Sequence, residues 1–445
     1  DVSLLDGHTD WREVFREASW EEALDVAARP LRELKDTFGL KALAGFGSAK
    51  GSNEEAYLFQ KLVRTGFGSN NVDHCTRLCH ASSVSALLEG IGSGAVSNPV
   101  MDVTKAEVIL IIGANPTVNH PVAATYFKQA TKRGAKLIIA DPRGQGLMRH
   151  ASHSLKFRPG TDVALLNAML HVMLWEGLCD QSWIDAHTEG FAALRDIVRE
   201  CTPTLAAEIC GVPAADIVQA ARWFAQSGAT LSLYCQGLNQ SANGTQNNAA
   251  LINLHLATAQ IGRPGAGPFS LTGQPNAMGG REVGGMANLL SGHRDLANAE
   301  HRAEVARLWG VDDVPAKPGR TAVELFEAVH RGEIKALWIA CTNPAQSMPD
   351  VTRVREALAR AEFVVVQEAY RNTDTAAFAD LLLPATTWGE KEGTVTNSER
   401  RISRVRAALT PAGESRADWR IGTEYEKVAV WAADGHAVPF TGYPY

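Results

Sequence analysis

Five short apolar runs of one kind recur along the chain, and they constrain its fold more than any other feature. Each is rich in Val, Ile, Leu or Ala and is followed at once by small or polar, mostly turn-forming residues. The runs are residues 108–112, 136–140, 230–234, 336–340 and 363–366. A strand that is apolar at nearly every position is buried on both faces, which is typical of parallel sheets covered by helices.

Helical stretches at residues 121–133 and 163–176 alternate with these strands and predict an α/β fold with mostly parallel sheets. Ligands of such sheets bind beyond the carboxyl ends of the strands. Since every predicted strand has its polar turn residues at that end, we expect a large ligand held mainly by backbone groups and small side chains.

Composition narrows the class of protein. A chain of 445 residues predicts two or three domains, and 45% hydrophobic with 21% charged residues is typical of a globular protein. A net charge of −6 disfavours general nucleic-acid binding, and no apolar run is long enough for a membrane span. Seven scattered cysteines do not form a disulfide framework, which favours a reducing compartment, the cytoplasm.

The sequence contains no complete nucleotide-binding motif. The glycine-rich segment 45–51 follows a predicted strand at 40–44 but is one residue too long for G-x-G-x-x-G, and no P-loop motif is present. Asp141 and Asp162 are better candidates because a carboxylate can accept from a purine or a ribose, although either can instead cap a helix. The Gly/Pro-rich stretch 261–285 is a linker or a binding loop, and its interleaved polar side chains favour binding.

Cys75 and Cys79 are the only two cysteines close together. Zinc and iron–sulfur sites each need about four ligands, so this pair alone predicts neither. An isolated cysteine is most often a small buried apolar residue. The residues around Cys75 and Cys79 allow a more specific interpretation of this segment.

Residues 70–84, NNVDHCTRLCHASSV, resemble the metal-ligand loop of molybdenum- or tungsten-dependent formate dehydrogenases. These belong to the bis-(molybdopterin guanine dinucleotide) oxidoreductases of the DMSO reductase superfamily, whose pattern is V-D-H-C-x-R-x-(C/U)-H. The resemblance implies that Cys79 is the thiolate ligand of the metal and that His80 helps to take up the proton from formate. Cys75 lies outside the ligand position and is interpreted as structural.

Further segments, at 47–55, 113–116, 141–143 and 159–164, are similar to cofactor-binding segments of the same family. The resemblance implies guanine, ribose, pyrophosphate and pterin contacts from residues scattered over most of the chain. They are Lys50, Gly113, Asn115, Asp141, Arg143, Gly160, Asp162, Gly237, Asn239, Gly273, Gln274 and Asn343.

The second half resembles a different branch of the family. Formate dehydrogenases carry an Arg before a G-Q-N-N-V-Q-G segment, whereas this chain has Thr272 there. Segments 272–285, 338–350 and 389–401 look like those of cytoplasmic assimilatory nitrate reductases, which commonly have Met where this chain has His80. Arg281 could hold a substrate anion, or it could lie at the surface or on a cofactor phosphate.

Three functions therefore remain open, namely formate oxidation, nitrate reduction and a cofactor-free structural module of a larger redox complex. We favour formate oxidation because His80 lies nearest the chemistry, with Cys79, His80 and Arg281 as catalytic candidates. Retention of Cys79, His80 and the cofactor segments argues against the structural module. The expected partners are a small anion and an electron-transfer subunit or iron–sulfur domain, with no nucleic acid.

The resemblance also implies how the domains are arranged. We expect a split α/β domain at 14–75 plus 273–390, an inserted α/β domain at 76–272, and a partial further domain or tail at 391–445. Family members commonly add an N-terminal [4Fe–4S] domain and a C-terminal β-barrel. Neither is expected within this chain, so the cluster would lie on a further segment or a partner.

Overall fold

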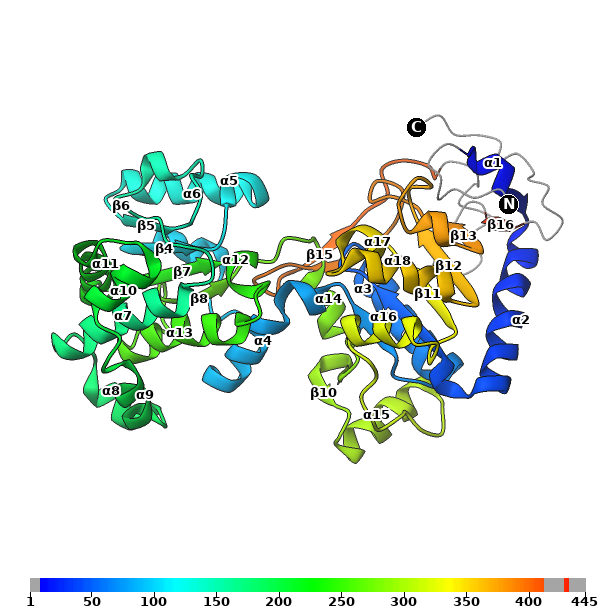
Figure 1. Cartoon of the computed structure of the whole chain (residues 1–445), viewed down its shortest axis with the longest axis horizontal. Coiled ribbons are helices and arrows are strands. Elements are labelled where there is room, and N and C mark those ends of the chain that lie inside the picture. Colours follow the sequence, from blue (N-terminus) through cyan, green and yellow to red (C-terminus); the bar gives the residue numbers. More distant parts are fainter. Residues whose placement is uncertain (1–8, 412–427, 432–445) are drawn as a thin grey trace. The chain divides into compact units, whose positions relative to one another are not determined.

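A computed structural model of the protein describes residues 9–411 and 428–431, which fall into two compact units (Figure 1). Unit 1 comprises the described parts of Asp1–Arg77, Gln274–Asn397 and Ile402–Tyr445. Unit 2 comprises Leu78–Gly273 and Ser398–Arg401. The domain limits expected from the sequence stay a prediction, and most of the expected tail lies outside the described residues.

Unit 2 is built on a five-stranded sheet in the order β6-β5-β4-β7-β8, in which every neighbouring pair is parallel. Its strands are β4 (Val108–Ile112), β5 (Lys136–Ala140), β6 (His153–Leu155), β7 (Thr230–Tyr234) and β8 (Gly267–Ser270).

Helices cover both faces of this sheet. Val108, Leu110 and Ile112 of β4 face a core formed with α7, α10, α11 and α13. Ile109 and Ile111 point the other way, into a core with Phe127 of α6. The helices are α4 (Thr76–Ile91), α5 (Pro116–Asn119), α6 (Pro121–Lys132), α7 (Asp162–Trp175), α8 (Gln181–His187), α9 (Phe191–Val198), α10 (Pro203–Cys210), α11 (Ala214–Gln226), α12 (Gln236–Asn239) and α13 (Gly244–Ala257), with short turns η4 (Val100–Thr104) and η5 (Met148–His150).

Unit 1 contains a seven-stranded sheet in the order β1-β16-β13-β12-β11-β2-β3. Its five strands from β13 to β3 are parallel, and β16 and β1 add antiparallel edge pairs. The strands are β1 (Phe15–Ala18), β2 (Leu43–Gly47), β3 (Val72–His74), β11 (Ala336–Ala340), β12 (Phe363–Glu368), β13 (Leu381–Pro384) and β16 (Val428–Trp431). Two-stranded ribbons join β9 (Leu289–Leu290) to β10 (Arg294–Asp295) and β14 (Gly393–Thr396) to β15 (Ile402–Val405).

Helices also flank the unit 1 sheet. Ala23, Ala27 and Leu31 of α2 pack on one face, while Phe46 of β2 meets Phe326 of α16 edge-on with ring centroids 5.4 Å apart. The helices are α1 (Trp11–Val14), α2 (Trp20–Phe38), α3 (Asn53–Lys61), α14 (Ala277–Glu282), α15 (Ala299–Trp309), α16 (Ala322–His330), α17 (Pro344–Ser347) and α18 (Val351–Arg360). A π-helix, η3 (Leu62–Phe67), follows α3, and η2 (Leu40–Ala42), η6 (Ser291–His293) and η7 (Ala376–Phe378) are short 3₁₀ helices.

The predicted fold class is confirmed, because both large sheets are mostly parallel and lie between helices. The bounds of one predicted strand were wrong. The strand placed at 40–44 begins at Leu43 and runs to Gly47, so Gly45 lies inside β2 and not in a loop. A Cβ at Gly45 would stand 2.6 Å from Val63 Cγ2, which explains a glycine within this strand. No helix in the described ranges has the length and apolar character that crossing a membrane requires.

Candidate functional site

Cys79, the predicted metal ligand, lies near the start of α4 and is buried. The side-chain amide of Gln236, the first residue of α12, donates from Nε2 to Cys79 Sγ at 2.6 Å. Gln236 Oε1 is buried and has no hydrogen-bond partner among the described residues. An N–H directed at sulfur favours the thiolate, which is the form that binds soft metals.

His80 follows Cys79 and is also buried. Its Nδ1 lies 2.7 Å from Ser270 Oγ, at the end of β8, and 3.0 Å from Asn239 Nδ2, at the end of α12. The end of β8 and the helix α12, which follows β7, therefore hold this ring.

A chain of amides determines which nitrogen of His80 carries the proton. Asn248 Nδ2 donates to the Gly244 carbonyl at 2.7 Å and to Asn239 Oδ1 at 3.0 Å. Because Asn239 Oδ1 accepts, the Asn239 group facing His80 is its NH₂, which can only donate. Nδ1 of His80 is therefore the acceptor, and the neutral ring carries its proton on Nε2.

The loops after β4 and β7 approach each other backbone to backbone. Gly237 N donates to Gly113 O at 2.9 Å, and a Cβ at Gly237 would lie 2.4 Å from Gly113 Cα. Gly113 also has φ +59°, in the left-handed region that favours glycine. Only glycine fits at both positions, so these two predicted cofactor residues form a narrow backbone crossing beside Cys79's partner Gln236.

Among the predicted nucleotide contacts, Asp141 closes a local turn. Its Oδ1 accepts from Arg143 N at 2.7 Å and its Oδ2 accepts from Gln145 Nε2 at 3.4 Å, while the Arg143 residue is exposed. Asn115 similarly accepts from Thr117 Oγ1 at 2.7 Å. Asp141 therefore closes a local turn and does not cap a helix, and its contact with a nucleotide stays a prediction.

Asp162 differs from Asp141 in its surroundings. It is the first residue of α7 and is buried, and desolvation raises the pKa of its carboxyl. The preceding loop contains Gly160, whose φ is +82° and at which a Cβ would meet nothing within 4 Å. Contact of Asp162 or Gly160 with a purine or a ribose stays a prediction.

In unit 1, Cys75 has its own contacts. Its thiol donates to Gln274 Oε1 at 3.0 Å and accepts from Ala49 N at 3.2 Å. Burial raises the pKa of Cys75, so it stays a neutral thiol near neutral pH. This hydrogen bond joins a residue expected to be structural, Cys75, to a residue expected to line a pterin, Gln274.

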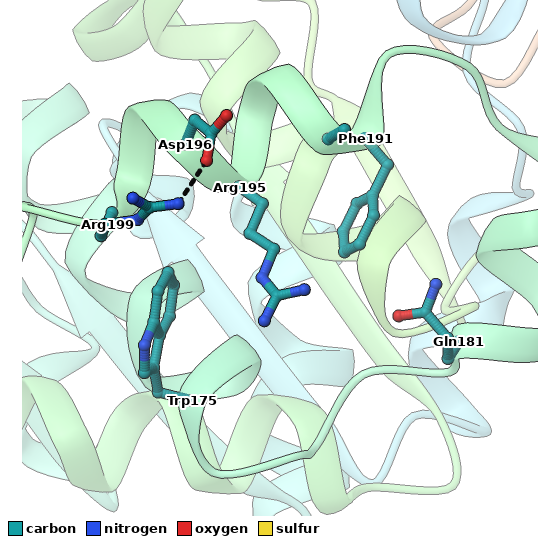
Figure 2. A pocket seen from close by; sticks show the side chains of 7 residues that line it. Trp175, Gln181, Phe191, Arg195, Asp196 and Arg199 are labelled. Atoms are coloured by element: carbon teal, nitrogen blue, oxygen red, sulfur yellow. Dashed lines mark hydrogen bonds and ion pairs between the residues drawn. The ribbon is translucent and has the colours of Figure 1, made fainter.

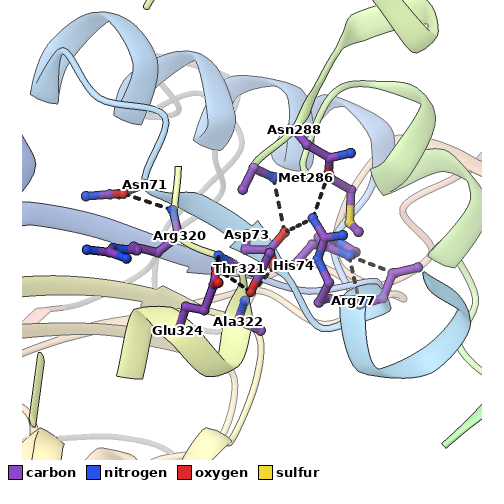
Figure 3. Close-up of polar contacts among 12 residues, drawn as sticks. Asn71, Asp73, His74, Arg77, Met286, Asn288, Arg320, Thr321, Ala322 and Glu324 are labelled. Atoms are coloured by element: carbon purple, nitrogen blue, oxygen red, sulfur yellow. Dashed lines mark hydrogen bonds and ion pairs between the residues drawn. The ribbon is translucent and has the colours of Figure 1, made fainter. Parts of the chain in front are cut away.

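Asp73, in β3, gathers donors from three segments of unit 1 (Figure 3). Its carboxylate accepts from Arg77 Nε at 2.9 Å, from Ala287 N at 3.1 Å and from Ala322 N at 2.7 Å. Arg77 Nη2 continues to Asn288 Oδ1 at 2.7 Å. Burial raises the pKa of Asp73 and Arg77 opposes that rise. This Asp73 clamp holds the first turn of α4, the helix that carries Cys79.

Arg281 is buried in α14, so the alternative that it lies at the surface was wrong. Its Nη2 lies 2.7 Å from Met278 Sδ. Its charge contributes to lowering the pKa of His74 to about 4, although burial of His74 is the larger cause. Arg281 therefore helps to keep its neighbour His74 neutral at physiological pH.

The remaining candidates lie on loops. Asn343 Oδ1 accepts from Thr375 Oγ1 at 2.7 Å and so fixes the loop after β12. Lys50 is exposed, and its charge opposes the rise that burial causes in the pKa of Glu368. A Cβ at Gly273 would meet nothing within 4 Å. Contacts of these residues with a pterin stay predictions.

Sequence reasoning missed Gln236, Asn248 and Ser270. Gln236 stood within a recognised turn after a predicted strand, and that position was the available signal. Ser270 ends a strand inside the Gly/Pro-rich stretch, where no apolar run marks it. Asn248 is a buried polar residue on a helix, which only the three-dimensional contacts reveal.

Comparison with known proteins decides the family. The sequence profile of the molybdopterin oxidoreductases matches residues 11–426. The chain belongs to the molybdopterin oxidoreductase family. It is 40% identical over 414 residues to a nitrate reductase of Synechocystis sp., covering 92% of this chain and 58% of that protein. It is 38% identical over 407 residues to an F420-dependent formate dehydrogenase subunit alpha of Methanocaldococcus jannaschii, covering 92% and 59%.

A solved structure, acetylene hydratase from Pelobacter acetylenicus, superposes with a TM-score of 0.73 at 22% identity and covers 90% of this chain and 57% of that one. This likeness shows the fold alone. The chain thus spans between 57% and 59% of the length of these three proteins. Family relatives are named both formate dehydrogenase and nitrate reductase, as the resemblance of the two halves predicted.

The family implies a molybdopterin cofactor with molybdenum or tungsten, and the residues present fit it. Within the described ranges, no three or more His, Cys, Asp and Glu side chains are grouped so as to hold a metal ion. At Cys79 the described residues would offer such a group a single protein thiolate. The buried Gln236 Oε1 and the Gly113–Gly237 crossing provide a polar group and close backbone approach for such a group.

Proposed function

We propose that this chain is the cofactor-binding core of a molybdenum- or tungsten-dependent formate dehydrogenase with a bis-(molybdopterin guanine dinucleotide). The observation that carries the proposal is the buried Cys79–His80 pair. Formate dehydrogenases of the resembling pattern have His beside the ligand cysteine, whereas assimilatory nitrate reductases commonly have Met. Formate oxidation yields carbon dioxide, one proton and two electrons, and the bound metal–pterin group would receive the electrons.

The residues of the chain itself would then hold the cofactor and orient the substrate. Gln236 Nε2 donates a hydrogen bond to the Cys79 sulfur, a contact that favours the thiolate form. The neutral His80 ring presents N–H at Nε2, because Asn239 occupies Nδ1. A donor at Nε2 suits a substrate oxygen, so the amide chain favours His80 as the hydrogen-bond donor that orients formate. This differs from the proton-uptake role expected from the resemblance, which would require Nδ1 to release Asn239.

Nitrate reduction is the second candidate, and Thr272 favours it. In place of a cationic Arg, Thr272 offers a hydroxyl that is hydrogen-bonded to Ser398, and its carbonyl accepts from His120 Nε2 at 2.6 Å. Because the Thr272 hydroxyl is uncharged, it lacks the positive charge that a carboxylate substrate prefers. The 40% identity to nitrate reductases points the same way.

The partners form part of the proposal. We infer that the substrate is a small anion and that electrons leave through an iron–sulfur domain or an electron-transfer subunit. The support is that no four-cysteine cluster motif occurs among the seven cysteines of this sequence.

Activity of the complete holoenzyme separates the two candidates. We expect formate to reduce an oxidised viologen dye faster than reduced viologen is oxidised by nitrate. His80→Ala should abolish formate turnover with unchanged metal content, and exposed His187→Ala should leave it intact. Nitrate turnover in the absence of formate turnover would overturn the formate assignment and support the second candidate.

A further inference from the structure

Unit 2 has a cavity of about 500 Å³ at its surface, formed by the end of α7, the start of α8 and one face of α9 (Figure 2). Its lining includes Trp175, Gln181, Phe191, Arg195, Asp196 and Arg199. The volume lies within the range of about 300–1,000 Å³ that is usual for small-molecule sites. None of these residues has a predicted role in the family's chemistry.

One aromatic wall of the cavity is held in place from behind. The Trp175 indole stacks on the His171 ring with centroids 4.4 Å apart and an angle of 8°. His171 Nδ1 donates to Val198 O at 3.0 Å, which ties α7 to α9. Phe191 supplies a second ring from the first turn of α9, one helical turn before Arg195. A planar ligand would therefore meet a rigid indole and lose little side-chain freedom on binding.

The two arginines of the cavity differ in whether they already have an ion-pair partner. Arg199 is paired with Asp196, whose Oδ1 lies 2.5 Å from Arg199 Nη2. Arg195 has no ion pair or hydrogen-bond partner among the described residues. Its guanidinium lies 5.9 Å from the Trp175 ring centroid, near the limit of a cation–π contact, so the indole holds it loosely. One cation is thus available, which suits a single carboxylate in bidentate contact.

Gln181 adds a polar acceptor. Its Nε2 donates to Asp185 Oδ1 at 2.7 Å, which leaves Oε1 to accept from a ligand. Figure 2 shows this amide across the cavity from the Trp175 ring, with the Arg195 guanidinium between them. A ligand that matches all these groups has an aromatic ring with an N–H or O–H and one carboxylate.

We propose that this cavity binds a small aromatic monocarboxylate whose ring carries an N–H or O–H donor. The site is separate from the predicted cofactor contact at Asp162, because Asp162 and Trp175 are the first and last residues of the 14-residue helix α7, about 20 Å apart along its axis. The proposal therefore does not depend on the proposed function.

Calorimetric titration of the whole chain with indole-3-acetate tests this site. We expect saturable binding that weakens at least about tenfold with the uncharged indole-3-acetamide, and no measurable binding of acetate, which lacks the ring. Arg195→Gln should weaken indole-3-acetate binding by about tenfold or more, and Trp175→Ala should do the same. Arg133→Gln, an exposed arginine at the end of α6 on the other face of the sheet, is the matched control and should bind as the native chain does.

Both cavity substitutions replace exposed residues, so the variants should fold, and circular dichroism verifies this. Equal binding of the acid and the amide would overturn the role of Arg195. No binding of indole-3-acetate, or binding unaffected by either substitution, would overturn the site itself.

Discussion

At the residue scale, the site in unit 2 depends on the orientation of two amides. Asn248 fixes Asn239, and Asn239 fixes the tautomer of His80. The sequence could predict Cys79, His80 and Asn239 because a family pattern contains them. It could not predict Asn248 or Ser270, since their role arises from contacts between segments distant in the chain.

The tautomer can be observed directly. In protein labelled with ¹⁵N-histidine, we expect the His80 ring to carry its proton on Nε2, with the signal assigned by its loss in His80→Gln. Asn239→Asp replaces the donor at Nδ1 by an acceptor, so the proton should appear at Nδ1. Asn298→Asp, which changes an exposed cap of α15, should leave the His80 signal unmoved. A native ring protonated only on Nδ1 would contradict the amide chain.

A second residue-scale prediction concerns pH. Burial lowers the pKa of His255 to about 3, and its ring contacts Gln260 O and Ser232 Oγ. An unfolded histidine titrates near pH 6.5, so below that pH the unfolded chain binds the additional proton and the folded state loses stability as pH falls.

Each pH unit between about 6 and 4 should therefore cost up to about 1.4 kcal/mol through this one side chain. Urea unfolding of the native chain and of His255→Gln at several pH values measures the difference. The variant should lose stability less steeply on acidification, whatever its stability at pH 7. Parallel pH profiles for the two chains would refute the assignment.

At the element scale, strands with mostly apolar runs were predictable and those defined by pairing were not. Residues 108–112, 136–140, 230–234 and 336–340 form β4, β5, β7 and β11 with those bounds. β8 was missed because its sequence, GPFS, has no strand pattern and becomes a strand by pairing with β7. Tertiary pairing overrides weak local propensity in such a case.

The Asp73 clamp joins β3, α4, the loop after α14 and the start of α16 within unit 1. Asp73→Ala would leave the Arg77 Nε–H and two buried backbone N–H groups without their acceptor, at a cost of about 3–5 kcal/mol. Urea unfolding measures this change. Glu333→Ala removes a half-exposed partner of Arg320 and Arg331 and should cost at most about 1 kcal/mol. Equal costs for the two variants would show that the clamp does not stabilise unit 1.

The crossing of the β4 and β7 loops makes a second element-scale prediction. Gly237→Ala places a methyl 2.4 Å from Gly113 Cα, where the neighbour is backbone and cannot move aside easily. We expect a loss of about 1–3 kcal/mol in unfolding free energy, by analogy with overpacked cores. Gly144→Ala meets nothing within 4 Å and should be nearly neutral. A neutral Gly237→Ala would show that the two loops are not packed this closely.

At the scale of the whole molecule, the family follows from the matched profile, while the reaction stays a proposal. The chain holds two mostly parallel α/β units, and one of them carries Cys79 with the Gln236 amide on its sulfur. The central claim is that Cys79 is the single protein ligand of a pterin-bound metal. A cofactor-free structural module would need no such thiolate.

Metal and pterin content of the native holoenzyme tests that claim most directly. Elemental analysis and pterin fluorescence after oxidation should find molybdenum or tungsten together with pterin in the native protein. The metal should be lost or labile in Cys79→Ala and retained in Cys75→Ala, because Cys75 lies outside the predicted ligand position. Absence of both metal and pterin from the native protein, or equal metal retention in the two variants, would contradict the account.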